Sequence, residues 1–234
     1  RSMRLFGSFD GGATWNVLLT LPPHVSEEYN SHWHCQVYDS YDGRIYASSG
    51  GGPNANLYYS DNLGETWDIV PLETYEARLP HGHPQPTLMM PFASRIAMSP
   101  DNALPPCVLS LIKDKQYDSV NTETFDWSLN YSIYPRVGTA SEKFAVAPFA
   151  INGVEGYFLS PSSENHRLAN IVGTGDGGQT WHTVATVNLS GGTPGQMRTT
   201  SGLIGIDLNG YMYFTTNAPG MIMKIKRPEW LYGS

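Results

Sequence analysis

Charged residues are scarce in this 234-residue chain, and long apolar runs are absent. Aspartate, glutamate, lysine and arginine together make up 15% of the sequence, the formal net charge is −7, and no lysine- or arginine-rich run occurs. Nucleic acid is therefore a poor partner, because its phosphates would be repelled on average. No apolar stretch approaches the roughly 20 residues that a membrane helix needs, so we expect no membrane insertion.

Cysteine and the common catalytic signatures are nearly missing as well. Cys35 and Cys107 are too few for a disulfide framework. Two unpaired, mostly buried thiols are favoured, and a disulfide bridge between Cys35 and Cys107 is the alternative. There is no Gly-x-Ser-x-Gly segment. The glycine-rich residues 48–56 lack the lysine and the helix of a phosphate-binding loop.

Glycine, proline and aromatic residues, by contrast, are plentiful. The chain has 24 glycines and 17 prolines, aromatic residues make up 12%, and 40% of the residues are hydrophobic. This composition is typical of many short strands joined by turns around a real core. We therefore predict one all-β domain over residues 1–234.

One short pattern, Ser/Thr-x-Asp-x-Gly-x-Thr-Trp, recurs along the chain. It appears as SFDGGATW at 8–15, within YSDNLGETW at 59–67, and within GTGDGGQTW at 173–181. In the second copy we take Asp61 as the aspartate, although it directly follows the serine, whereas one residue separates the two positions in the other copies. With two degraded copies, five tryptophans mark one register about fifty residues apart, the period of four-stranded propeller blades. They are Trp15, Trp67, Trp127, Trp181 and Trp230.

Each part of the pattern has a structural task in a hairpin turn. Glycine supplies a positive φ, and the aspartate side chain accepts N–H groups of the turn. The tryptophan begins the next strand and is expected to pack back over the hairpin. The residues with these roles are Asp10, Gly12, Trp15, Asp61, Gly64, Trp67, Asp176, Gly178 and Trp181.

Further hairpins surround these turns. Asp42-Gly43 and Asn209-Gly210 lie between alternating apolar residues, which is the strongest short hairpin signal. Together with the strands before and after each tryptophan turn, this gives four strands per repeat, two in the first repeat and three in the fifth. We predict a β-propeller of four-stranded antiparallel blades. Five blades in a closed ring are favoured over part of a larger ring.

The repeated turn resembles the Asp-box, also called the bacterial neuraminidase repeat. That repeat occurs in sialidases, other glycan-active enzymes, sorting receptors, photosystem assembly factors and phage tail proteins. The segment HWHCQVYDSYDGRIYASSGG at 32–51 is also similar to sialidase-like modules of phage tail and bacterial surface proteins. The resemblance implies a carbohydrate or cell-surface glycan as partner and an extracellular or virion-surface location. It also implies a place in an oligomeric fibre or surface protein.

A binding site is expected where the segments that lead into the inner strands converge. Side chains that can stack on a sugar or bind its polar groups occur there: His32, Trp33, His34, Arg78, His81, His83, Lys143 and Arg198. Because residues i and i+2 share a face of a strand, His32 and His34 should point the same way.

The two His-x-His pairs have two interpretations. Four imidazoles suit zinc or a similar metal. The favoured interpretation is hydrogen bonding to backbone or ligand, with no metal and no cofactor. The residues concerned are His32, His34, His81 and His83.

Two functions stay open, non-catalytic glycan recognition, which we favour, and a carbohydrate-active enzyme. A sialidase, by the resemblance, needs an arginine triad, a tyrosine–glutamate pair and an aspartic acid. Candidates for the triad are Arg78, Arg136 and Arg198. However, Arg95-Ile96 is followed by alanine where the family has Arg-Ile-Pro, and no tyrosine–glutamate pair can be assigned. A lyase with His32 or His83 as its base is the other enzymatic alternative.

Overall fold

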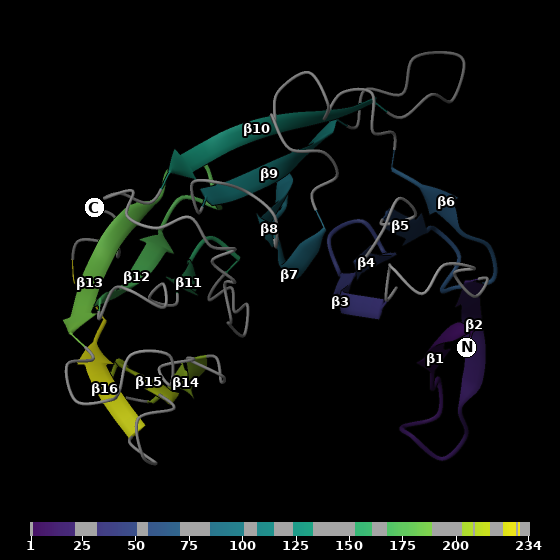
Figure 1. Cartoon of the computed structure of the whole chain (residues 1–234), viewed down its shortest axis with the longest axis horizontal. Helices are drawn as coiled ribbons and strands as arrows, with labels where there is room; N and C mark the ends of the chain where they lie inside the picture. Colours follow the sequence, from purple (N-terminus) through teal and green to yellow (C-terminus); the bar gives the residue numbers. More distant parts are fainter. Residues whose placement is uncertain are drawn as a thin grey trace.

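The protein, seen here as a computed structural model, is all-β, with several small antiparallel sheets and almost no helix among the residues that the structure describes. Five sheets follow one another around an open arc, with the first and the fifth at its ends (Figure 1). The favoured closed five-bladed ring is thus not what the described part of the chain forms. The structure describes residues 2–21, 32–50, 56–70, 85–100, 107–114, 124–132, 153–160, 168–188, 203–207, 209–215, 222–227 and 229.

Every sheet is a meander in which strands consecutive in sequence pair antiparallel. The first sheet has two strands and the second four: β1 (Met3–Gly7), β2 (Asn16–Leu21), β3 (His32–Asp39), β4 (Arg44–Gly50), β5 (Leu57–Ser60) and β6 (Asp68–Ile69). The third sheet also has four: β7 (Pro86–Pro91), β8 (Arg95–Pro100), β9 (Cys107–Asp114) and β10 (Thr124–Ser132). The fourth and fifth have three each: β11 (Gly156–Ser160), β12 (Leu168–Thr174), β13 (His182–Asn188), β14 (Leu203–Ile206), β15 (Tyr211–Thr215) and β16 (Ile222–Lys226).

These strands agree with the hairpins expected from the sequence. The turns at Asp42-Gly43 and Asn209-Gly210 join β3 to β4 and β14 to β15, and both glycines have a positive φ. The two strands of the first repeat and the three of the fifth are confirmed. The strand expected ahead of β11, near residues 144–151, lies outside the described residues.

The sheets stand side by side rather than in layers. Strands β3, β7, β11 and β14 lie on the inner side of the arc, and the last strand of each sheet lies on the outer side (Figure 1). Strand β3 packs against β7 of the next sheet.

The main hydrophobic core fills the space between the second and third sheets. Tyr46 and Leu57 contribute from the second sheet, and Met89, Ile96 and Leu111 from the third. Full burial of such a side chain stabilises the fold by about 1.5–3 kcal/mol. Contact between neighbouring sheets therefore holds the arc together.

The same set of hydrogen bonds recurs in each tryptophan turn. In the first, Asp10 Oδ1 accepts the Thr14 N–H at 2.9 Å, the Ser8 hydroxyl accepts the Gly12 N–H at 2.7 Å, and the Trp15 indole donates to the Gly12 carbonyl at 3.2 Å. The third turn repeats these contacts: the aspartate is Asp176, the glycine Gly178 and the tryptophan Trp181.

The second turn corrects one assignment. Asn62, and not Asp61, takes the place of the aspartate, because its Oδ1 accepts the Thr66 N–H at 2.9 Å. The capping side chain bonds the threonine four residues later, so its distance from the tryptophan is fixed, and Asn62 has that spacing. Asp61 instead accepts a hydrogen bond from Nε of Arg44. Gly64 and Trp67 have their expected roles.

Two other expectations about tryptophan do not hold. Trp127 lies inside β10, opposite Leu111, and not at the start of the strand like Trp67 or Trp181. The indole of Trp15 bonds the Gly12 carbonyl of its own turn, but the residue is largely exposed and does not gain the burial expected of it. Trp230 lies outside the described residues.

Candidate functional site

Two histidine rings meet at the beginning of the inner strand β3. The Nε2 atoms of His32 and His34 are 2.9 Å apart, and the ring centroids are 4.7 Å apart. The expectation that the two rings share one side of the strand is confirmed. His32 is exposed and His34 is half-buried, so the pair lies at the surface. We call this region, with Gly50 and Gln85, the histidine end.

Local backbone irregularity positions His34. The β3–β4 register shifts between Trp33 and Cys35, so His34 is the extra residue of a bulge. Bulges commonly re-aim a side chain beside a site. Gly50 on β4 pairs with His32, and a Cβ built on it would overlap the imidazole of His34. The glycine therefore makes room for the ring.

The neighbouring sheet fixes the orientation of the His34 ring. Its Nδ1 lies 3.1 Å from the carbonyl oxygen of Gln85, just ahead of β7. A carbonyl only accepts, so we infer that this Nδ1 carries a proton. In the neutral ring Nε2 is then an acceptor, and Nε2 of His32 donates to it. Gln85 itself has φ 37°, a conformation that costs a non-glycine residue about 1–3 kcal/mol.

Trp33 lies between the two histidines in sequence, but its ring contact is with Tyr58. Its ring meets the ring of Tyr58 edge-on, with centroids 5.9 Å apart. Within the described part of the chain, its buried indole N–H has no hydrogen-bond partner. Such an unpaired donor is unusual in a folded protein.

The other predicted site residues cannot be placed. The described residues include His32, Trp33 and His34 on β3, and of these the structure brings the rings of His32 and His34 into contact. Outside them lie Arg78, His81, His83, Lys143 and Arg198. Among the residues that the structure describes, no group of three or more histidine, cysteine or acidic side chains could hold a metal. Cys35 is a free thiol that donates to the Pro86 carbonyl, so a bridge to Cys107 is not formed.

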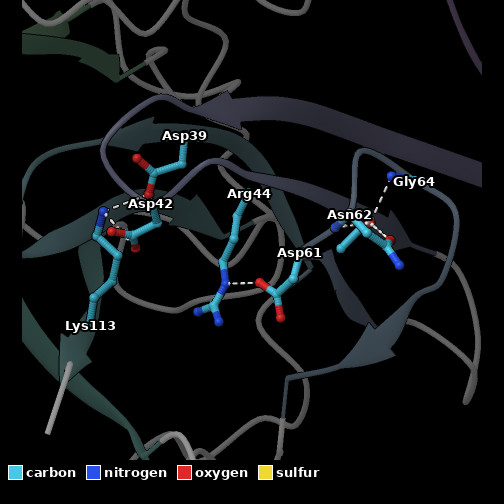
Figure 2. A network of polar contacts seen from close by, with 8 residues as sticks. Asp39, Asp42, Arg44, Asp61, Asn62, Gly64 and Lys113 are labelled. Atoms are coloured by element: carbon cyan, nitrogen blue, oxygen red, sulfur yellow. Dashed lines mark hydrogen bonds and ion pairs between the residues drawn. The ribbon is translucent and has the colours of Figure 1, made fainter. Parts of the chain in front are cut away.

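A buried ionic cluster lies at the opposite end of the strands, which we call the turn end. Lys113 Nζ is 2.5 Å from Oδ2 of Asp39 and 3.2 Å from Oδ2 of Asp42 (Figure 2). The side chains of Lys113 and Asp39 are 2% and 0% exposed. Lys113 belongs to the third sheet and the two aspartates to the second, so the cluster ties two sheets together. Beside it, Arg44 pairs with Asp61 (Figure 2).

A second buried cluster ties the fourth sheet to the fifth. The Tyr157 hydroxyl donates to Glu155, and Arg227 binds both oxygens of that carboxylate. Burial, together with the hydrogen bond to Glu155, raises the pKa of the Tyr157 phenol far above its ordinary value. A nucleophilic tyrosine must be reachable and easily deprotonated, and Tyr157 is buried with a raised pKa. This pair is structural.

Sequence reasoning missed both clusters. Their partners are far apart in the chain, 74 residues for Lys113 and Asp39 and 72 for Arg227 and Glu155. One signal was visible, since Lys113 is a lone charge in the apolar run CVLSLIK. A buried charge needs a partner, but the sequence alone does not say which.

The comparisons with known proteins add no relative. The chain matches no model of a known protein family and no curated protein. In the part of the chain that the structure describes, no helix has the length and apolar character needed to cross a membrane.

Proposed function

We propose that this chain is a β-propeller module that binds a carbohydrate at its histidine end without transforming it. The observation that carries the binding proposal is the His32–His34 pair, with its Nε2 atoms 2.9 Å apart on an inner strand. The propeller is supported by consecutive antiparallel meanders whose first strands line the inside of the arc (Figure 1). The likeness of the turns to the Asp-box supports it as well.

The chemistry of the histidine end suits a sugar. Each sugar hydroxyl both donates and accepts, as an imidazole does. Because Gln85 of the third sheet holds His34 of the second, the site spans two sheets and is already ordered before a ligand arrives. Prior ordering lowers the entropic cost of binding.

The burial of the tyrosine–glutamate pair favours binding over sialidase-type hydrolysis. The tyrosine–glutamate pair formed by Tyr157 and Glu155 is buried, and it lies at the turn end rather than beside the histidines. A carbohydrate-active enzyme that uses His32 as a base is the second candidate, because that ring is exposed. The setting that agrees best with a binding module is an extracellular or virion surface, such as a receptor-binding part of a phage tail.

A glycan array tests the proposal, with product analysis of every glycan that binds. We expect binding without product, and we expect His32→Ala to weaken it about tenfold, the loss of roughly one hydrogen bond. His182→Ala is the matched control, because His182 is also exposed but begins the outer strand β13. Equal loss in both variants, or no binding at all, contradicts the proposal. Product that disappears in His32→Ala favours the enzyme.

A further inference from the structure

The two ring nitrogens that meet at the histidine end have the separation of two ligands of one metal ion. The Nε2 atoms of His32 and His34 are 2.9 Å apart. With metal–nitrogen distances of about 2.0–2.1 Å, two nitrogens at a right angle lie about 2.8–3.0 Å apart, and two at the tetrahedral angle about 3.3–3.4 Å apart. The observed separation therefore fits neighbouring positions around a square-planar or tetragonal ion better than a tetrahedral zinc site.

The tilt of the two rings agrees with this separation. Their centroids are 4.7 Å apart and their planes are inclined by 50°. Two rings placed end to end along the line between their Nε2 atoms would have centroids farther apart, so the rings are bent away from that line. A hydrogen bond prefers a straight arrangement. A metal ion instead requires the bend, because its bonds to the two rings meet at an angle.

The surroundings of His34 are those of a histidine that binds a metal. Such a histidine almost always donates its other ring N–H to a carbonyl or carboxylate, which fixes the tautomer and the ring orientation. Nδ1 of His34 makes this contact with the Gln85 carbonyl at 3.1 Å, and Nε2 keeps the lone pair that a metal needs. The contact comes from the third sheet, so it is independent of the distance between the two Nε2 atoms.

We propose that His32 and His34 bind one divalent transition-metal ion through their Nε2 atoms, with copper(II) preferred. Imidazole suits copper, nickel and zinc, a tetragonal arrangement selects copper(II) or nickel(II), and copper(II) binds most tightly of the three. The proton on Nε2 of His32 then moves to its Nδ1, and the ion replaces the hydrogen bond between the rings. Among the described residues this pair belongs to no group of three or more histidine, cysteine or acidic side chains, so water takes the remaining positions. The site of four imidazoles stays a prediction, because His81 and His83 lie outside the described residues.

Titration of the chelator-treated whole chain with copper(II) tests this proposal. NMR follows the histidine ring signals, which bound copper(II) broadens. No carbohydrate is present, so the result does not depend on the proposed function. We expect the signals of His32 and His34 to broaden together, at a lower copper concentration than those of the exposed His182. An equimolar amount of zinc(II) should leave them broadened, and zinc(II) that restores them overturns the preference for copper.

Variants show whether the two rings act as one site. His32→Ala should raise the copper concentration that broadens the His34 signals at least about tenfold, and His34→Ala should do the same for His32, because each variant leaves one ligand. Gly50→Ala keeps both rings but places a methyl group where the His34 imidazole lies, so it should also weaken binding. His182→Ala is the control and should change neither signal, and circular dichroism shows that each variant is folded. Two rings that broaden independently, no broadening at either, or a midpoint that neither histidine variant moves overturns the proposal.

Discussion

The buried ion pair between Lys113 and Asp39 gives the sharpest prediction about stability. Lys113→Met keeps the apolar stem but removes the ammonium group that lies 2.5 Å from Asp39 and 3.2 Å from Asp42. The buried carboxylate of Asp39 then loses this counterion. Removing one partner of a buried pair costs about 3–5 kcal/mol. Since whole domains are stable by about 5–15 kcal/mol, the variant should lose a large share of its stability.

Urea unfolding followed by tryptophan fluorescence measures this loss. Lys226→Met is the control, because Lys226 and Glu229 form an exposed pair at 3.2 Å, worth about 0–1 kcal/mol. Adding Asp39→Asn to Lys113→Met should restore part of the loss by removing one unpaired buried charge. If Lys113→Met costs no more than Lys226→Met, the cluster does not hold the second and third sheets together.

Three further predictions concern single side chains. Leu63 has φ 55° at the position where the other two turns have Gly11 and Gly177, both at φ 71°. Leu63→Gly should therefore raise the free energy of unfolding by about 1 kcal/mol and Tm by about 2–4 °C. A lower Tm in calorimetry contradicts this. Hydrogen bonds from the Thr14 N–H, the Thr14 hydroxyl and Ser8 lower the pKa of Asp10 from 3.8 to about 2. The first tryptophan turn should therefore be intact above pH 3.8 and loosen as the pH falls through 2. NMR should then show the Thr14 amide moving while Thr66, capped by Asn62, does not, and Asp10→Asn should abolish the difference. Burial raises the pKa of the Cys35 thiol to about 12, so iodoacetamide at pH 8 should modify it in the unfolded chain and not in the native one, as mass spectrometry of the Cys35 peptide will show.

The local features of the fold could be predicted from the sequence, because they depend on short spacings. Asp42-Gly43 and Asn209-Gly210 specify hairpins within a few residues of themselves, and both form. The prediction for Asp61 is wrong for a related reason. The spacing to Trp67, and not the residue type, decides which side chain caps the turn, and that spacing selects Asn62. Trp127 shows that a tryptophan at the right period does not by itself mark a turn.

The long-range features could not be predicted, because they depend on which sheets become neighbours. Nothing local connects Lys113 with Asp39, or Arg227 with Glu155. The candidate site was predicted in part, since the His-x-His spacing placed His32 and His34 together. The bulge at His34 and the room made by Gly50 appear only in three dimensions. Closure of the arc depends on its end sheets, and the repeat period does not determine it.

The central claim, that a carbohydrate binds at the histidine end, is tested most directly by NMR of the histidine rings. Two-bond ¹H–¹⁵N spectra should be recorded while the protein is titrated with a glycan selected on the array. We expect the ring nitrogens of His32 and His34 to shift in a saturable manner, while those of His182 stay in place. Shifts at His182 alone, or no shift at His32 and His34 as the glycan binds, contradict the claim.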